Sequence, residues 1–174
     1  MTEPLQDPAV LMAFGQTPAE VRERLSNELD RFEAQLRTRQ ADWTRVQPER
    51  DWSPAQEAEH VLLINEGITR LLALLLSSRE LRAAPQTPGV MKEGRRQAPP
   101  HTLPSAQGLA WAEMDGRWAE HRTRLEEAAS QVRATPGRTM WHPFYGELDA
   151  LDWLRMIVGH LYSHRRLLER SAGA

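Results

Sequence analysis

The stretch WSPAQEAEHVLLINEGITRLLALLLSSR, residues 52–79, is the most informative part of the sequence for the fold. Its segment Ser53-Pro54-Ala55-Gln56 supplies an N-cap hydroxyl, a proline at the first helical position and an N3 side chain that can bond back to the cap. Trp52 can act as the hydrophobic staple before that cap. The run Leu71 to Leu76 is apolar almost all round, so it should be buried on most sides. We predict a long core helix that ends near Arg79.

Three further segments repeat apolar residues at helical spacing. One opens with the capping box Thr17-Pro18-Ala19-Glu20 and is expected to end near Arg39. Another is expected from about Ser105 to Arg133, and the last begins near Asp149. No segment shows a convincing strand pattern. We therefore predict an all-α protein with the architecture of a four-helix bundle.

Residues 83–104 form a long connection between the second and third predicted helices. They contain five prolines and no helical or strand periodicity. At about 3.3 Å per extended residue, such a segment can run back along a whole helix. Helices two and three are then expected to lie parallel, as in bundles with a crossover connection. With residues 1–16 as an N-terminal extension, we expect residues 1–174 to form a single domain.

Composition narrows the range of functions. Lys and Arg total 22 against 24 Asp and Glu, so the basic excess of a dedicated nucleic-acid binder is missing. There is no cysteine, which excludes thiolate zinc ligands and a cysteine nucleophile supplied by the chain. The N-terminus does not resemble a signal peptide, and the longest apolar run is too short to cross a bilayer. We expect a cytoplasmic protein with no nucleic-acid or membrane partner.

Three histidines are the candidate metal ligands. His160 and His164 are four residues apart on the last predicted helix, so both imidazoles project from one face. His60 lies about 10 Å from the start of its helix, and His164 about 10 Å from the end of its own. If the two helices are antiparallel neighbours, all three imidazoles fall at one level. Three core histidines that only form hydrogen bonds would satisfy the same pattern, so spacing alone leaves both interpretations open.

Three imidazoles around one point suit zinc, nickel or a similar divalent ion. With three protein ligands, at least one coordination position stays open for water or substrate, which is typical of catalytic sites. A structural site would more often be closed by a fourth protein ligand, and none can be named from the sequence.

Other polar residues are expected to lie outside this group or cannot be assigned to it. We expect His142 to brace its loop and His101 and His121 to be solvated. Tyr162 should point away from the histidine pair. Glu57 and Asn65 could contact the ligands or a substrate, but nothing in the sequence favours this. The pairs Arg95-Arg96 and Arg165-Arg166 are most simply solvated charges, although either could attract an anionic substrate.

Three stretches resemble the DinB/YfiT-like superfamily of bacterial four-helix-bundle metalloproteins. They are Trp52-Ser53-Pro54 with Glu59-His60-Val61-Leu62, His142 to Leu148, and Trp153-Leu154 with His160 and His164. The resemblance implies that His60, His160 and His164 bind the metal. It further implies a homodimer and a small-molecule substrate, because characterised members include bacillithiol S-transferases and mycothiol-dependent maleylpyruvate isomerases. In such enzymes an open metal position would bind a low-molecular-weight thiol as thiolate.

Two classes of function follow from these observations. The first is a metal-dependent, thiol-linked transferase or hydrolase acting on small electrophiles, with catalytic residues beyond the ligands unassigned. The second is a non-catalytic helical scaffold with a vestigial metal site, acting through dimerisation or partner binding. A DNA-associated stress protein is a third and weaker alternative, because the charge balance speaks against it.

Overall fold

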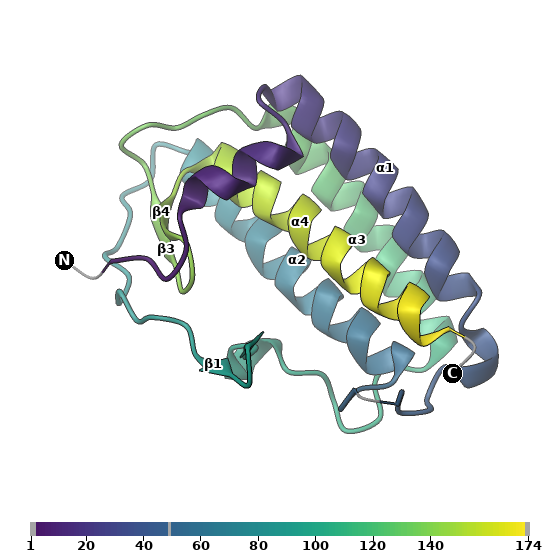
Figure 1. Cartoon of the computed structure of the whole chain (residues 1–174). Coiled ribbons are helices and arrows are strands. Elements are labelled where there is room, and N and C mark those ends of the chain that lie inside the picture. The colour runs from purple at the N-terminus through teal and green to yellow at the C-terminus, as the bar shows by residue number, and fades with distance from the viewer. Residues whose placement is uncertain (1–2, 49, 173–174) are drawn as a thin grey trace.

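Four long helices form the bundle in the computed structural model, which describes residues 3–48 and 50–172. Helix α1 spans Pro18–Arg37, α2 Pro54–Leu76, α3 Trp111–Gln131 and α4 Ala150–Ser171 (Figure 1). The predicted all-α class and four-helix architecture are confirmed.

Local capping interactions start three of the helices. The Thr17 hydroxyl accepts a hydrogen bond from the Glu20 backbone N–H, and Ser53 accepts one from that of Gln56. In both boxes the N3 side chain bonds back to the cap. The Asp149 carboxylate caps α4 by accepting from the backbone N–H of Asp152 at 2.9 Å. These caps need only three or four neighbouring residues, which is why the sequence reveals them.

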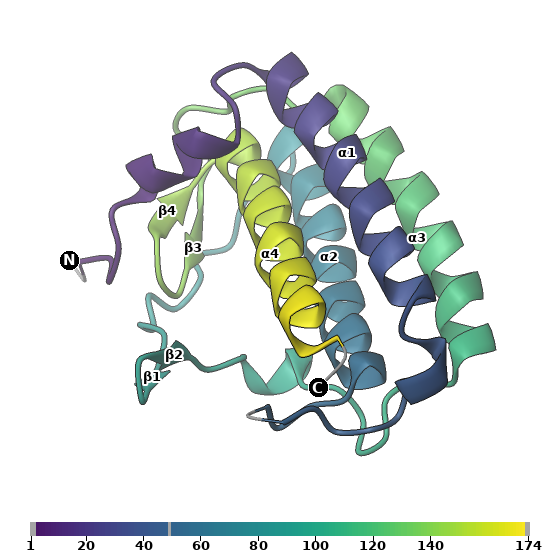
Figure 2. The same cartoon turned by 45° about the vertical axis from the view of Figure 1, so that its right-hand side comes forward.

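The crossover places α2 and α3 parallel, as predicted. In Figure 2, α1 and α4 run down the bundle, whereas α2 and α3 run up it. The starts of α2 and α3 therefore lie at the same end, where the Trp43 indole N–H donates to the Leu109 carbonyl at 2.9 Å. On its way back the crossover contacts the loop before α4, since the Trp141 indole N–H donates to the Thr87 carbonyl at 3.0 Å.

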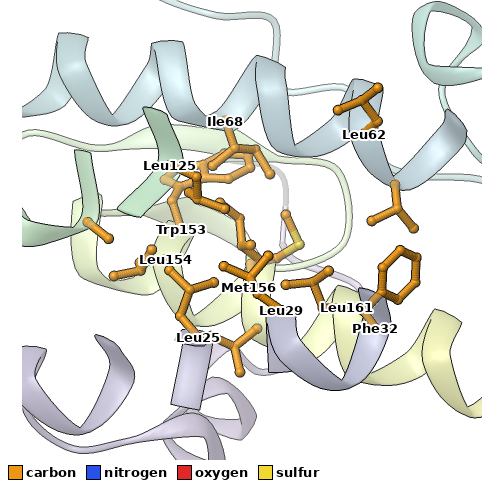
Figure 3. Packing of buried hydrophobic residues seen from close by; sticks show 14 of the residues in the cluster. Leu25, Leu29, Phe32, Leu62, Ile68, Leu125, Trp153, Leu154, Met156 and Leu161 are labelled. Atoms are coloured by element: carbon orange, nitrogen blue, oxygen red, sulfur yellow. The ribbon is translucent and has the colours of Figure 1, made fainter. Parts of the chain in front are cut away.

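The core is a continuous apolar interior between the four helices (Figure 3). Phe32 of α1 is fully buried and stacks on Trp118 of α3, with ring centroids 5.1 Å apart. Burial of this apolar surface is the main driving force for folding. The labelled side chains come from all four helices: Leu25, Leu29, Phe32, Leu62, Ile68, Leu125, Trp153, Leu154, Met156 and Leu161.

Helix α3 begins later than the sequence suggested. The prediction placed its start near Ser105, but the helix begins at Trp111. Gly108 has a φ of +73° and lies so close to Ala55 that an added Cβ would be 2.6 Å from the Ala55 Cβ. The chain passes tightly over the start of α2 before it can turn into a helix. A close approach between distant segments of this kind is invisible to periodicity.

Two short antiparallel hairpins were not predicted. One pairs β1 (Met91–Lys92) with β2 (Arg95–Arg96) inside the crossover, and the other pairs β3 (Met140–His142) with β4 (Gly146–Leu148) before α4. Strands of two or three residues are too short to show alternation, so the sequence pattern could not reveal them.

Two other details differ from or add to the predicted picture. The end of α2 is less buried than expected, because only Leu72 and Leu75 of its leucine run are fully enclosed. The N-terminal extension carries a 3₁₀ helix, η1 (Pro8–Phe14), that packs on α4; a Cβ on Gly159 would lie 2.7 Å from the Phe14 ring.

Within residues 3–48 and 50–172, no helix is both long and apolar enough to span a membrane.

Candidate metal centre

The three predicted histidines converge between α2 and α4. Ring centroids of His60 lie 5.1 Å from His160 and 5.0 Å from His164, and the last two are 4.4 Å apart. One potential ligand atom from each of the three side chains lies within 4.8 Å of the other two. The antiparallel pairing of α2 and α4 produces this convergence, because it sets His60 at the level of the pair on α4. The group could hold a divalent metal ion.

The crossover orients His60. A short 3₁₀ helix, η3 (Pro100–Thr102), brings the Thr102 carbonyl to 2.8 Å from His60 Nδ1. A carbonyl can only accept, so Nδ1 carries the proton and the Nε2 lone pair is free for a ligand. This is the arrangement in which a second interaction fixes the tautomer of a metal-binding histidine. Thr102 is 42 residues from His60, and no sequence signal pointed to it.

Glu57 orients His164 in the same manner. Its carboxylate Oε2 lies 2.6 Å from His164 Nδ1, while its Oε1 accepts from the Arg50 guanidinium. The Glu57 side chain is only 2% exposed. Because Arg50 already compensates its charge, the carboxylate can accept the Nδ1–H of a neutral imidazole. His164 Nε2 is thereby left with its lone pair. The sequence left the role of Glu57 open, and the structure links it to one of the three histidines.

His160 completes the group. Its Nε2 lies 3.2 Å from His60 Nε2. Two nitrogens bound to one zinc ion at about 2.1 Å are about 3.4 Å apart in tetrahedral geometry, so this spacing fits two ligands of one ion. The other ring nitrogen, Nδ1, is buried and has no hydrogen-bond partner among the described residues.

Burial keeps these imidazoles neutral at pH 7. Desolvation is the largest cause that lowers the pKa of His60, and it holds the pKa values of His160 and His164 well below 6.5. The neighbouring imidazoles add to the effect at His160 and His164, and the Arg50 charge adds to it at His60 and His164. A metal ligand must be the unprotonated imidazole, so the site is prepared in the required protonation state.

His142 braces the turn of the β3–β4 hairpin, as the sequence favoured. Its Nδ1 accepts from the backbone N–H groups of Phe144 and Tyr145, at 3.1 and 3.3 Å. Burial lowers the pKa of His142 to about 4, so the ring is neutral and its Nε2 carries the proton. The ring lies 5.1 Å from that of Trp153.

Some candidate residues lie elsewhere. Tyr162 is 45% exposed and points away from the pair, and His101 is exposed, as expected. Two expectations of solvation were wrong: His121 is buried beside Trp118, and Arg165 is buried in an ion pair with Glu28 at 2.8 Å.

Asn65 is also buried, on the core-facing side of α2. Neither polar atom of its side chain has a partner among the described residues, and none of the described contacts joins it to the three histidines. The possibility that Asn65 contacts the ligands, left open by the sequence, is therefore not supported.

The sequence matches the model of a known protein family. The model of the DinB superfamily matches residues 24–168, a span that includes all three histidines and Glu57. The chain belongs to the DinB superfamily. This DinB-superfamily chain also resembles a solved structure described as "TT2238, a four-helix bundle protein", with a TM-score of 0.65 and 25% identity. The match covers 89% of this chain and 100% of that one. No curated protein matches the sequence.

Proposed function

We propose that this DinB-superfamily protein binds a divalent metal ion, zinc or nickel, through His60, His160 and His164 and uses it as an enzyme. The reaction we propose is thiol-dependent S-transfer to, or hydrolysis of, a small electrophile. The observation that carries the proposal is the convergence of three neutral imidazoles, two of which have their tautomers set by Thr102 and Glu57.

The donor set fits such an ion. Imidazole nitrogens suit zinc and nickel, whereas an oxygen-rich site would suit magnesium or calcium. Each of the two outer contacts directs a ring lone pair towards the centre of the group. Three ligands leave at least one coordination position open, which favours a catalytic over a structural site. A bound divalent ion supplies Lewis acidity, lowering the pKa of a coordinated thiol or water.

The chain's own residues have separate tasks in this proposal. Thr102 and Glu57 hold the N–H groups of His60 and His164. Trp52 packs against the His60 ring, with centroids 5.0 Å apart, and excludes water from that side. Since the protein has no cysteine, the sulfur of an S-transfer must come from a low-molecular-weight thiol.

The wider cellular setting is part of the same proposal. We infer a cytoplasmic homodimer that acts on small molecules and does not bind nucleic acid. The near balance of 22 basic and 24 acidic residues supports the last point.

Elemental analysis of untagged protein tests the metal centre. We expect about one equivalent of zinc, nickel or a neighbouring metal, lost in a His160→Ala/His164→Ala double variant. His101→Ala is the matched control, because His101 is an exposed histidine outside the group. Circular dichroism establishes that each variant is folded. A parent protein that contains no metal and takes none up from micromolar Zn²⁺ or Ni²⁺ would refute the proposal.

Activity is tested separately, on protein that has been shown to hold metal. A panel of thiols and small electrophiles is assayed for consumption of both, before and after treatment with a chelator. We expect turnover that depends on the metal and is restored when the metal is returned. Turnover that is unaffected by metal removal would contradict the proposed role of the ion.

A further inference from the structure

A cavity of about 430 Å³ lies at the end of α2, where the chain leaves the bundle for the crossover (Figure 1). Its lining comes from the last turns of α2, the segment that follows them and the start of β3: Leu74, Arg79, Glu80, Arg82 and Met140. Small-molecule sites usually measure about 300–1,000 Å³, so a small organic ligand fits. Leu74 lies about 21 Å from His60 along the axis of α2, which separates this cavity from the candidate metal centre.

One side of the cavity is apolar. Leu74 and Met140 are both half-buried, and Met140 packs against the hydrophobic core. Each side chain therefore keeps part of its apolar surface in contact with solvent. A hydrocarbon group placed on these two side chains removes that surface from water, which is favourable.

Arg138 fixes the wall of the cavity. Its Nε donates to the Leu75 carbonyl at 3.0 Å. Its Nη2 donates to the carbonyls of Leu74 and Arg79, at 3.2 and 2.9 Å. The last carbonyls of a helix carry partial negative charge, so this guanidinium offsets the charge that α2 would otherwise present there. The same hydrogen bonds tie the segment after α2 to the helix, and the lining is thereby pre-organised.

The rim of the cavity carries excess positive charge. Arg79 and Arg82 are exposed, and neither forms an ion pair with another of the described residues. Glu80 is the acidic residue of the lining, so two guanidiniums stand against one carboxylate. A concave surface with an excess of one charge concentrates ligands of the opposite charge. A guanidinium also offers paired N–H groups that match the two oxygens of a carboxylate.

We propose that this cavity binds a small amphipathic anion, a molecule with one carboxylate and a hydrocarbon body. The carboxylate is held by Arg79 and Arg82, and the hydrocarbon covers Leu74 and Met140. A purely polar anion gains nothing from the apolar side, and an uncharged hydrocarbon gains nothing from the arginines. The cavity therefore favours molecules that combine both features. This site goes beyond the proposed metal-dependent function and does not depend on it.

Three probes test the proposal: octanoate, 1-octanol and inorganic phosphate. Protein labelled with ¹³C at its methionine methyl groups is titrated with each probe, and the Met140 signal is followed by NMR. Loss of the signal in Met140→Leu assigns it. We expect octanoate to shift this signal saturably and to bind about threefold to thirtyfold more tightly than 1-octanol, because two exposed charge pairs form. Phosphate should leave the signal nearly unchanged.

The double variant Arg79→Gln/Arg82→Gln removes both charges at exposed positions. We expect it to bind octanoate no more tightly than 1-octanol, while its affinity for 1-octanol stays within about twofold of wild type. Arg45→Gln/Arg124→Gln is the matched control, because it changes the net charge equally at two exposed arginines outside the cavity. The control should retain the full preference, and circular dichroism establishes that each variant is folded.

Several results would overturn the proposal. Octanoate that leaves the Met140 signal unshifted, or that binds no more tightly than 1-octanol, contradicts it. So does a preference that survives in Arg79→Gln/Arg82→Gln or disappears in the control. Phosphate that shifts the signal as strongly as octanoate would show a general anion site and would also overturn it. None of these results bears on the metal centre, which is tested separately by metal content.

Discussion

Glu57 joins the candidate metal ligands to the surrounding charges, and Glu57→Gln tests that link. The carboxylate is 2.6 Å from His164 Nδ1 and also accepts from Arg50. Glutamine has nearly the same shape but no charge. If its amide oxygen faces His164, its NH₂ group faces the donors of Arg50. One of the two hydrogen bonds is therefore lost in either orientation.

The structure allows the size of the effect to be estimated. Loss of an outer partner of a ligand histidine costs about 10- to 100-fold in metal affinity, or about 1.4–2.7 kcal/mol. Breaking a fully buried ion pair costs about 3–5 kcal/mol of folding stability. The Arg50 side chain is 22% exposed and can reach water, so we expect a smaller loss of about 1–3 kcal/mol.

Competition with a chromophoric chelator measures zinc affinity, and urea unfolding of metal-free protein measures stability independently. Glu66→Gln is the matched control, because Glu66 is another glutamate of α2 that pairs with an arginine, Arg117, at 3.2 Å. It should leave zinc affinity within about twofold. Unchanged zinc affinity in folded Glu57→Gln would refute the reasoning, as would an equal loss in the Glu66 variant.

Three further predictions concern the fold. His121 has its pKa lowered from 6.5 to about 4 by burial, so its contribution to stability is present above about pH 6.5 and decreases as the pH falls towards 4. Urea unfolding at several pH values measures the stability of wild type relative to His121→Leu. This difference should fall by about 2 kcal/mol between about pH 7 and about pH 5, and a difference that stays constant would contradict the lowered pKa of His121. Gly108→Ala should lower the free energy of unfolding by about 2–4 kcal/mol, because φ is +73° and the new Cβ would strike Ala55. Gly67→Ala is the control: nothing lies within 4 Å of the added Cβ, so this variant should be neutral or stabilised by up to about 1 kcal/mol. Equal effects of the two substitutions would refute the argument. Phe32→Ala should cost about 3–5 kcal/mol in the same assay, because the ring is fully buried against Trp118; a loss below about 1 kcal/mol would mean that the core packs differently.

Much of the site could be predicted because its main elements are local. The spacing of His160 and His164 guarantees a shared face on any helix, and the proline-rich crossover implied parallel α2 and α3. His121 could also have been placed correctly. It falls on the same stripe as Met114, Trp118 and Leu125, so periodicity outweighs the charged neighbours that suggested a solvated face.

The helices, their caps and the histidine pair could be predicted from the sequence alone, because each depends on residues within a few turns of one another. The surroundings of the three imidazoles, by contrast, depend on how distant segments pack together. Thr102 reaches His60 and Arg50 reaches Glu57 through the paths of irregular connections, and no periodicity encodes such paths. The protonation state of the three histidines could not be predicted from the sequence either. It follows from burial and from the summed charges of segments that are distant in the chain but adjacent in space.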